Sequence, residues 1–483
     1  MVNDKLSRKQ IHIHLLGICG TGMAALAGIL KEQGLQVTGS DEHVYPPMST
    51  LLEGLGIPIQ NGYRAANLDP APDLVVVGNV IRRENPEAQA VLARDLPRLS
   101  LPEALNRFLV GDRESIVVAG THGKTTTTAL ISWLLYDLGL DPGFMVGGIA
   151  RNFQTNYRVG RGRYVVLDSD EYDTAFFDKR PKFIHFHPRA AVLTSIEFDH
   201  ADIYPDLDRI IQAFESFLET VAPGGRVLAW GDAPLVRQVC GRSQAPVSFY
   251  GINDEVAWQA AAIRPVPGGM HFTVRREGVP WGEFLLPMVG EYNVLNALAA
   301  LAVLSELGAK PAALREALAG FKGVRKRQEV AGEFQGVLVL EDFAHHPTAV
   351  AVTLAAVRQA YPERRLVAAF EPRTNTSRRK IFQEPYAQAF HDANLILLRE
   401  PPDLWKVEPE EQFSSRQLVA DLTARGQDAR YFPDTDQLLA ELLHQVRPGD
   451  VVLVMSNGDF DHLVPRICEA LGGKKQIDIG AGG

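Results

Sequence analysis

The sequence has few cysteines: Cys19, Cys240 and Cys468 are the only three in 483 residues, and they stand far apart. Isolated cysteines exclude a disulfide framework and a cysteine-rich metal cluster, and they are typical of a reducing cytoplasm. Long apolar runs are also lacking, because none approaches the roughly 18 residues of a membrane span and no basic N-terminus precedes an apolar segment. We therefore expect a cytoplasmic protein with neither a membrane span nor a secretory leader.

An excess of positively charged residues is lacking as well. With 49 Lys and Arg against 58 Asp and Glu, the net charge is −9. This balance disfavours nucleic-acid or membrane partners bound through a broad basic face. Apolar residues make up 46% of the chain, which is enough to build large buried cores. The sequence leaves monomer and homodimer open.

Short apolar strands alternate with Ala- and Leu-rich helices along the whole chain. This rhythm is typical of α/β domains built on parallel sheets, and the length suggests about three domains of ~150 residues. We predict a Rossmann-like domain at residues 1–108, a central α/β domain at 109–323 and a second Rossmann-like α/β domain at 324–483. The predicted strands are 11–16, 35–38 and 74–78 in the first domain, 164–167, 191–194 and 226–229 in the second, and 337–340, 366–370, 395–398 and 451–455 in the third; helices are predicted at 23–33 and 293–307.

A Gly-rich turn joins an apolar strand to a helix in VVAGTHGKTTTT, residues 117–128. Amides in such a turn cradle phosphates, a lysine neutralises them, and a threonine hydroxyl can hold Mg²⁺. The spacing is two residues tighter than in the usual Walker A loop, and a packing turn without nucleotide is the alternative. The order of elements favours a nucleoside triphosphate on a P-loop ATPase-type central domain. The predicted phosphate-binding residues are Gly120, Thr121, His122, Gly123, Lys124, Thr125 and Thr126.

A second Gly-rich turn, Gly17-x-x-Gly20-x-Gly22, follows the first predicted strand. It is similar to the dinucleotide-binding fingerprint but differs from it in spacing. Asp41 ends the next strand, where an acid can face a ribose hydroxyl. From these residues alone, a nicotinamide-nucleotide site and a simple packing turn both stay open.

Acidic segments follow two predicted strands of the central domain: DSDEYD at 168–173 and EFDHAD at 197–202. In a domain with a phosphate-binding turn, acids at the carboxyl ends of parallel strands commonly hold Mg²⁺. His200 lies between acids, which favours a metal-binding role over the structural role that is more usual for a lone histidine. A solvated acidic turn is the alternative for the first segment.

Two further segments carry polar side chains at the ends of elements. Asn293 and Asn296 are three residues apart, so they share one face of the predicted helix, where their amides can pair with a base edge. Capping of the helix by Asn293 is the alternative.

The stretch EDFAHHP, residues 341–347, follows Arg325-Lys326-Arg327 and opens the third domain. Its acids and histidines suit either a nucleotide or substrate cleft or a polar strand-end loop.

Together these segments resemble the Mur ligase family, the ATP-dependent amide-forming enzymes of peptidoglycan metabolism. The resemblance covers residues 11 to about 471. It runs in family order through GICGTGM, GTHGKTTT, DSDEYD, IEFDHAD, NVLNALAA, RKRQE and DFAHHPTAV. Each piece alone is modest, whereas the combination is highly specific.

The resemblance implies ATP and Mg²⁺ as cofactors and a role for each matching position. Lys124 would contact the β- and γ-phosphates, Thr125 and Asp168 would bind one Mg²⁺, and His200 would bind the second. The adenine would meet Asn293 and Asn296, the phosphates Arg327, and the ribose Asp342. The UDP moiety would be held by Gly17, Gly20, Thr21, Gly22, Met23, Ser40 and Asp41. The incoming peptide would meet His345, His346, Arg373, Asn375 and Thr376, and the catalytic set would be Lys124, His200, Arg327, His345 and His346.

Two stretches are informative about the branch of the family. GxxGTGM and the HHP segment are similar to members that use UDP-N-acetylmuramate. DEYDTAFFDKR at 170–180 and FEPRTNT at 370–376 are similar to members that join this sugar nucleotide to a recovered murein tripeptide, L-Ala-γ-D-Glu-meso-diaminopimelate, in peptidoglycan recycling. That activity implies an acyl phosphate formed from the lactyl carboxylate and ATP, then attack by the peptide amine. Free L-alanine is the nearest alternative acceptor; an NAD(P)-dependent oxidoreductase and a nucleotide-dependent binding switch are remoter alternatives.

Three positions depart from the family pattern. Asp168 stands where Glu is usual, Tyr292 stands where His often precedes the asparagine pair, and no lysine follows IEFDHAD. We therefore expect the metal at Asp168 to lie closer to the strand or to bind through water. We expect no carbamylated lysine at the second Mg²⁺ site.

Overall fold

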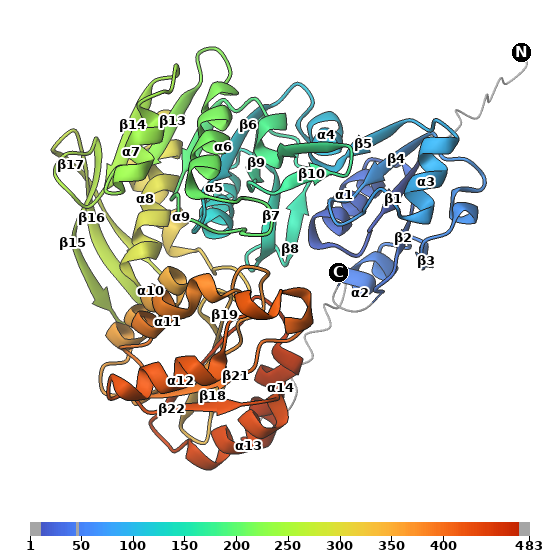
Figure 1. Cartoon of the computed structure of the whole chain (residues 1–483). Helices are drawn as coiled ribbons and strands as arrows, with labels where there is room; N and C mark the ends of the chain where they lie inside the picture. The colour runs from blue at the N-terminus through green and yellow to red at the C-terminus, as the bar shows by residue number, and fades with distance from the viewer. Residues whose placement is uncertain (1–10, 45–47, 473–483) are drawn as a thin grey trace, which may run out of the picture.

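The computed structural model describes residues 11–44 and 48–472 and contains three large sheets, each packed against helices (Figure 1). The predicted three-domain α/β fold is confirmed. The outer ends of the first and third predicted domains, residues 1–10 and 473–483, lie outside the described residues. Within the described ranges, no helix is long and apolar enough to cross a membrane.

The N-terminal sheet has five parallel strands in the order β3-β2-β1-β4-β5. Helices cover both faces of the sheet, so its central strand is buried except at its first residue, although two of its five residues are histidines. The strands are β1 (His12–Leu16), β2 (Gln36–Asp41), β3 (Ile59–Asn61), β4 (Leu74–Val77) and β5 (Arg98–Ser100), and the helices are α1 (Thr21–Glu32), α2 (Met48–Gly54), α3 (Pro86–Ala93) and α4 (Leu101–Leu105).

The central sheet has ten strands in the order β17-β16-β15-β14-β13-β12-β6-β9-β7-β8. The strands from β15 to β7 pair in parallel, and antiparallel strands extend both edges. The strands are β6 (Glu114–Ala119), β7 (Gly143–Ala150), β8 (Thr155–Arg158), β9 (Tyr164–Asp168), β12 (Ala190–Leu193), β13 (Arg226–Trp230), β14 (Val247–Gly251), β15 (Trp258–Val266), β16 (Gly269–Arg276) and β17 (Val279–Leu286). The helices are α5 (Lys124–Asp137), α6 (Leu207–Glu219), α7 (Pro234–Cys240), α8 (Glu291–Glu306) and α9 (Pro311–Ala319).

A two-stranded hairpin, β10 (Asp173–Ala175) and β11 (Asp178–Pro181), stands apart from the central sheet. It contains most of the DEYDTAFFDKR stretch. Phe176 and Lys179 of this hairpin line a cavity of about 490 Å³, opposite residues 79–84 that follow β4 of the N-terminal sheet. The hairpin therefore brings the central domain to the carboxyl edge of the N-terminal sheet.

The C-terminal sheet has six strands in the order β18-β19-β23-β20-β21-β22, parallel except for β18. Helices cover both of its faces, over two separate apolar cores. The strands are β18 (Glu329–Phe334), β19 (Val337–Asp342), β20 (Leu366–Phe370), β21 (Leu395–Arg399), β22 (Ala429–Phe432) and β23 (Val451–Met455), and the helices are α10 (Pro347–Ala360), α11 (Gln383–Ala389), α12 (Ser415–Ala424), α13 (Thr435–Gln445) and α14 (Leu463–Ala470).

The N-terminal and central domains meet where α1 lies against β8. A Cβ atom added to Gly28 would lie 2.3 Å from the Tyr157 ring, so α1 can approach β8 only because this residue has no side chain. The Asn156 side-chain amide also donates a hydrogen bond to the carbonyl of Thr21 at 3.2 Å. One continuous apolar core runs through this contact from the N-terminal sheet to one face of the central sheet.

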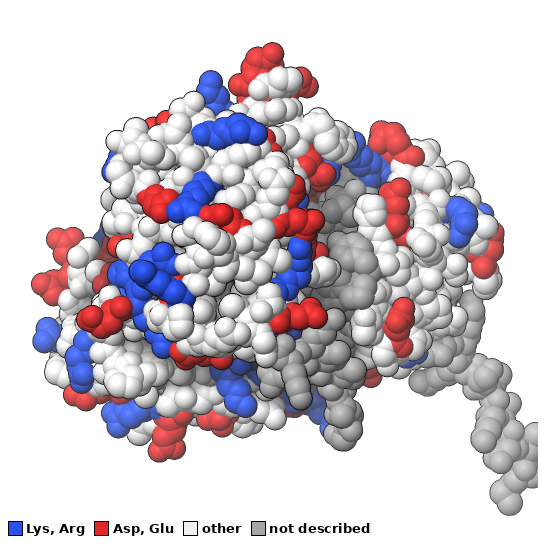
Figure 2. Space-filling view, turned by 90° about the horizontal axis from the view of Figure 1, so that it is seen from below, with Lys and Arg blue, Asp and Glu red and all other residues white. Residues whose placement is uncertain are grey.

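Charged residues are mixed on the face seen in Figure 2, where Lys and Arg are interspersed with Asp and Glu.

Candidate active site

The predicted phosphate loop lies between β6 and α5. Gly123 has φ of +80° and is the residue before α5, and no side chain in the described part of the chain caps this helix. The first amides of α5 are therefore available to an anion. A Cβ atom on Gly123 would lie 2.4 Å from Asn296 Oδ1, so packing and backbone conformation both require glycine.

The Lys124 ammonium folds back over this loop. It donates hydrogen bonds to the carbonyls of Gly120 and Thr121, the latter at 3.1 Å, and lies 3.9 Å from Glu171 Oε2. Glu171 is buried. Burial would raise the pKa of its carboxyl, but the Lys124 and His200 charges outweigh burial and hold that pKa at about 2. The negative charge of the buried Glu171 carboxylate thus balances the positive charge of the Lys124 ammonium.

Thr125 and Asp168 place a hydroxyl and a carboxylate side by side at the phosphate loop. The Thr125 hydroxyl donates to Asp168 Oδ2 at 2.7 Å, and the Gly147 amide donates to the same oxygen at 3.0 Å. Burial raises the pKa of Asp168, although Lys124 and Thr125 oppose the rise. A hydroxyl and a carboxylate oxygen beside a phosphate loop are hard ligands that suit Mg²⁺. These residues therefore fit the metal that the sequence predicts.

His200 lies in the loop after β12, with φ of +57°. Its Nε2 is 3.2 Å from Glu171 Oε1, and its Nδ1 is 4.0 Å from Asp199 Oδ1. Burial would lower the pKa of His200, but the two carboxylates raise it overall. His200 is thus brought to the acidic side of the phosphate loop, in contact with the residue that balances Lys124.

The asparagine pair links α8 to the phosphate loop. Asn296 Oδ1 accepts a hydrogen bond from the Thr127 hydroxyl at 3.2 Å, and its amide faces Asn293 Oδ1 at 3.3 Å. The Asn293 amide donates to the Val289 carbonyl at 2.8 Å. Gly290, not Asn293, is the residue before α8, so the capping interpretation of Asn293 is wrong.

Arg327 and Asp342 come from the C-terminal domain. The Arg327 guanidinium lies 4.4 Å from the centre of the Phe343 ring. Burial lowers the pKa of Arg327, whereas Asp342 and, from the central domain, Asp168 raise it. Asp342 accepts hydrogen bonds from the amides of Gln328 and Ala344, at 2.8 and 2.7 Å. Arg327, which belongs to the C-terminal domain, thus adds a positive charge near Asp168 at the phosphate loop.

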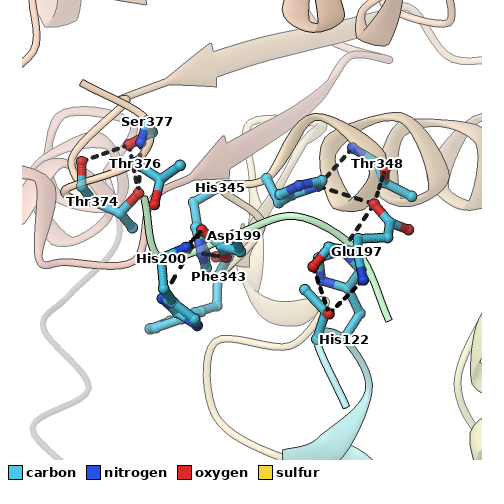
Figure 3. A network of polar contacts seen from close by, with 12 residues as sticks. His122, Glu197, Asp199, His200, Phe343, His345, Thr348, Thr374, Thr376 and Ser377 are labelled. Atoms are coloured by element: carbon cyan, nitrogen blue, oxygen red, sulfur yellow. Dashed lines mark hydrogen bonds and ion pairs between the residues drawn. The ribbon is translucent and has the colours of Figure 1, made fainter. Parts of the chain in front are cut away.

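The loop after β12 contacts the C-terminal domain through acidic residues (Figure 3). Glu197 Oε2 accepts a hydrogen bond from the Thr348 hydroxyl at 2.7 Å and lies 3.6 Å from His122 Nε2. Asp199 Oδ2 lies 4.0 Å from His345 Nε2, on the side opposite His200. Burial lowers the pKa of His345 to about 4, so its ring is neutral at pH 7.

The residues predicted to meet the peptide are partly engaged with protein groups. The Asn375 amide donates to Asp202 Oδ2 at 2.8 Å, and the Thr376 hydroxyl accepts from the Ala201 amide at 3.3 Å. Arg373 pairs with Asp459 at 3.2 Å. In this arrangement, Asn375 and Thr376 hold the C-terminal domain against the loop after β12.

The Gly-rich turn at residues 17–22 leads into α1, whose first residues are Thr21, Gly22 and Met23. No side chain in the described ranges caps α1. Asp41 Oδ2 accepts from the Cys19 amide at 2.9 Å, and the Ser40 carbonyl accepts from the amides of Gly17 and Ile18. The Asp41 carboxylate therefore supports the turn, and the open end of α1 beside it suits a phosphate.

The motifs predict no individual role for three acidic residues of the site, Glu171, Glu197 and Asp199. Their contacts with Lys124 and with the histidines depend on which loops meet in space. The sequence signal for these acids is their position next to motif residues with a predicted role.

The comparisons with known proteins agree with this arrangement. The chain matches, in order, the families described as "Mur ligase family, catalytic domain" at residues 12–113, "Mur ligase middle domain" at 118–304 and "Mur ligase, glutamate ligase domain" at 326–458. The chain belongs to the Mur ligase family.

Its relatives within the family include a peptide-adding ligase. The chain is 40% identical over 473 residues to the UDP-N-acetylmuramate–L-alanyl-gamma-D-glutamyl-meso-2,6-diaminoheptandioate ligase of Escherichia coli (strain K12), covering 96% of this chain and 99% of the relative. The crystal structure of a murein peptide ligase from Psychrobacter arcticus matches with a TM-score of 0.72 at 34% identity, over 96% of this chain and 99% of that one. The UDP-N-acetylmuramate–alanine ligase of Thermotoga maritima matches with a TM-score of 0.79 at 25% identity, over 95% and 99%.

Proposed function

We propose that this chain joins the lactyl carboxylate of UDP-N-acetylmuramate to the amine of L-Ala-γ-D-Glu-meso-diaminopimelate, at the cost of ATP. The observation that carries the proposal is the 40% identity to the E. coli ligase of that name across 96% of the chain. The reaction proceeds in two steps. The carboxylate attacks the γ-phosphate of ATP and ADP leaves; the peptide amine then attacks the acyl phosphate, and phosphate leaves as the amide forms.

The phosphate loop supplies the charge that the first step needs. A carboxylate and a triphosphate repel each other, so cations in a dry cleft must stabilise the transition state. Lys124 exchanges its carbonyl partners for the β- and γ-phosphates, and Arg327 approaches from the C-terminal domain. Thr125 and Asp168 would hold one Mg²⁺ and His200 a second, and these ions would supply charge that neutralises the phosphate oxygens. The amides of residues 120–126 surround the phosphates.

The remaining nucleotide contacts come from α8 and β19. Asn293 and Asn296 face the adenine and Asp342 the ribose. In the second step the amine must lose a proton. His345 is suited to accept it because its ring is neutral at pH 7, and Asp199 at 4.0 Å stabilises the imidazolium that results. His346 is the other candidate for this step.

We assign the substrates to three domains, at 1–108, 109–323 and 324–483. The first holds the UDP moiety through Gly17, Gly20, Thr21, Gly22, Met23, Ser40 and Asp41; the second holds ATP; the third holds the peptide through Arg373, Asn375 and Thr376. Reaction occurs when the domains close, which keeps water from the acyl phosphate.

The three unpaired cysteines suit a reducing cytoplasm.

The second candidate function is the addition of free L-alanine to the same sugar nucleotide. The TM-score of 0.79 to the Thermotoga maritima alanine ligase favours it. A score over a whole multidomain chain also depends on how its domains are oriented. The higher sequence identity to the peptide-adding relatives therefore carries more weight for the choice of acceptor.

A phosphate-release assay with UDP-N-acetylmuramate, ATP and Mg²⁺ tests the proposal when it compares the tripeptide with L-alanine at equal concentration. We expect kcat/KM for the tripeptide to exceed that for L-alanine by at least about 100-fold. The reverse preference would establish the second candidate, and phosphate release without a ligated product would refute both.

A further inference from the structure

Three side chains that commonly ligate metals converge where the central and C-terminal domains meet. His122 belongs to the phosphate loop, Glu197 to the loop after β12, and His346 immediately precedes α10. Their ligating atoms all lie within 4.8 Å of one another. None of the three belongs to the set Thr125, Asp168 and His200 that we assign to Mg²⁺. The roles proposed above for His122 in the phosphate loop and for His346 as an alternative proton acceptor leave the Glu197 carboxylate between them without a function. Binding of an ion by His346 would leave the proton transfer to His345.

The distances within the cluster approach those of a coordination sphere. Glu197 Oε2 lies 3.6 Å from His122 Nε2 and 3.5 Å from His346 Nδ1. In a tetrahedral Zn²⁺ site with bonds of about 2.0–2.1 Å, neighbouring ligand atoms are about 3.3 Å apart. Small side-chain rotations would therefore bring the carboxylate and both imidazoles to one ion.

The surrounding hydrogen bonds orient two of the ligands. His346 Nε2 lies 3.3 Å from the carbonyl oxygen of Phe198. A carbonyl can only accept, so Nε2 carries the proton and Nδ1 carries the lone pair. Metal-bound histidines typically donate their other ring N–H in this way. The Nδ1 lone pair accepts a hydrogen bond from the Thr348 amide at 3.3 Å, the cap of α10, and a bound ion would replace this contact. The Thr348 hydroxyl orients the carboxylate in turn, by donating to Glu197 Oε2 at 2.7 Å.

The third ligand is His122, whose buried Nε2 makes no hydrogen bond within the described residues, although Glu197 lies 3.6 Å away. Such an arrangement is costly and uncommon in folded proteins. The backbone holds this residue in place, because its amide donates to Ser195 Oγ at 2.9 Å and its carbonyl accepts from the Thr194 hydroxyl. A cation at the cluster would give Nε2 a partner.

The protonation states also suit a cation. Burial lowers the pKa of His346 to about 4, so its ring is neutral at pH 7. Burial would raise the pKa of Glu197, but His122, Thr348 and His346 outweigh it and hold that pKa at about 2. A neutral imidazole and an ionised carboxylate are the forms that bind metal.

We propose that His122, Glu197 and His346 form a binding site for Zn²⁺ or a similar divalent cation of intermediate softness. Two imidazoles and one carboxylate favour Zn²⁺ over Mg²⁺, which prefers an all-oxygen shell. Three protein ligands leave a fourth position for water. Because two ligands come from the central domain and one from the C-terminal domain, the bound ion links these domains beside the phosphate loop.

The test is calorimetric titration of the metal-free full chain with Zn²⁺ in millimolar Mg²⁺, and of the same protein with Co²⁺ monitored by visible absorption. We expect one Zn²⁺ per chain and the strong absorption of four-coordinate Co²⁺. His122→Asn and His346→Asn should each weaken Zn²⁺ binding at least about tenfold and remove the Co²⁺ band. Asparagine at 346 can still cap α10.

His391→Asn is the matched control, because His391 also lies beside a carboxylate, 3.2 Å from Asp392, but its side chain is 70% exposed. It should leave the Zn²⁺ affinity unchanged. Circular dichroism of the metal-free variants verifies folding, and the near-isosteric Glu197→Gln carries the test if a histidine variant does not fold. Absence of Zn²⁺ uptake by the wild type, or equal affinity in all variants, would overturn the proposal. Neither result depends on the ligase assay, so the two proposals can fail independently.

Discussion

Alanine at Gly123 perturbs the phosphate loop at a single point. The residue has φ of +80° and an added Cβ would lie 2.4 Å from Asn296 Oδ1. Gly139, which follows the other end of α5, offers a matched control, because its φ is +75° and nothing lies within 4 Å of an added Cβ. Both substitutions force alanine into the left-handed region, but only the first must displace a buried side chain.

The magnitudes follow from this difference. The left-handed conformation costs an alanine about 1–2 kcal/mol at either position. Moving Asn296 breaks its contacts with the Thr127 hydroxyl at 3.2 Å and with Asn293 at 3.3 Å, each worth about 1 kcal/mol. We therefore expect Gly123→Ala to lower the free energy of unfolding by about 2 kcal/mol more than Gly139→Ala does.

Urea denaturation of the two variants and the wild type measures these values, and calorimetric titration with a nonhydrolysable ATP analogue measures the effect on nucleotide binding. Gly123→Ala should also weaken binding of the analogue, whereas Gly139→Ala should not. Equal losses of stability in the two variants would refute the argument, because they would show that Asn296 moves aside without cost.

Three further outcomes follow from the site. Lys124→Ala should abolish ligation but keep calorimetric UDP-N-acetylmuramate binding; unchanged turnover would exclude the phosphate role. Burial lowers the pKa of His345 from 6.5 to about 4. Between these two pH values the unfolded chain binds a proton at this residue that the folded protein does not bind. The free energy of unfolding should therefore fall as the pH drops from 6.5 towards 4. His345→Gln should flatten this slope in urea denaturation; equal slopes would contradict the assignment. Asn375→Ala and Asp202→Ala should show a coupling of about 1 kcal/mol in a double-mutant cycle of stability, and purely additive effects would exclude an energetic link across the 2.8 Å bond.

The buried strands were predictable from the sequence, and several other strands were not. β6, β20 and β23 are apolar runs because helices cover both faces of their sheets. β7 contains three glycines and β22 has only half-buried residues, so neither shows a clear apolar pattern. Pairing with neighbouring strands, which the sequence does not encode locally, determines these elements.

Some contacts of the candidate site were also predictable from the sequence, and others were not. The phosphate loop and the Thr125–Asp168 pair follow from motifs, because residues near the ends of adjacent parallel strands come together in any α/β sheet. The contact of Lys124 with Glu171 depends on the path of the chain after β9, and that of Asn375 with Asp202 depends on how two domains meet. A motif can therefore identify a residue without revealing its partner.

Because α1 lies so close to β8, the size of the side chain at position 28 determines how closely the N-terminal and central domains can approach each other. The residue lies in the middle of a helix, where glycine is unfavourable by about 1 kcal/mol relative to alanine, and it lies outside both Gly-rich turns. Any side chain there would act as a wedge against Tyr157. Substitutions at Gly28 with side chains of increasing size would thus tilt the N-terminal domain relative to the central domain by increasing amounts, without altering any residue assigned to chemistry.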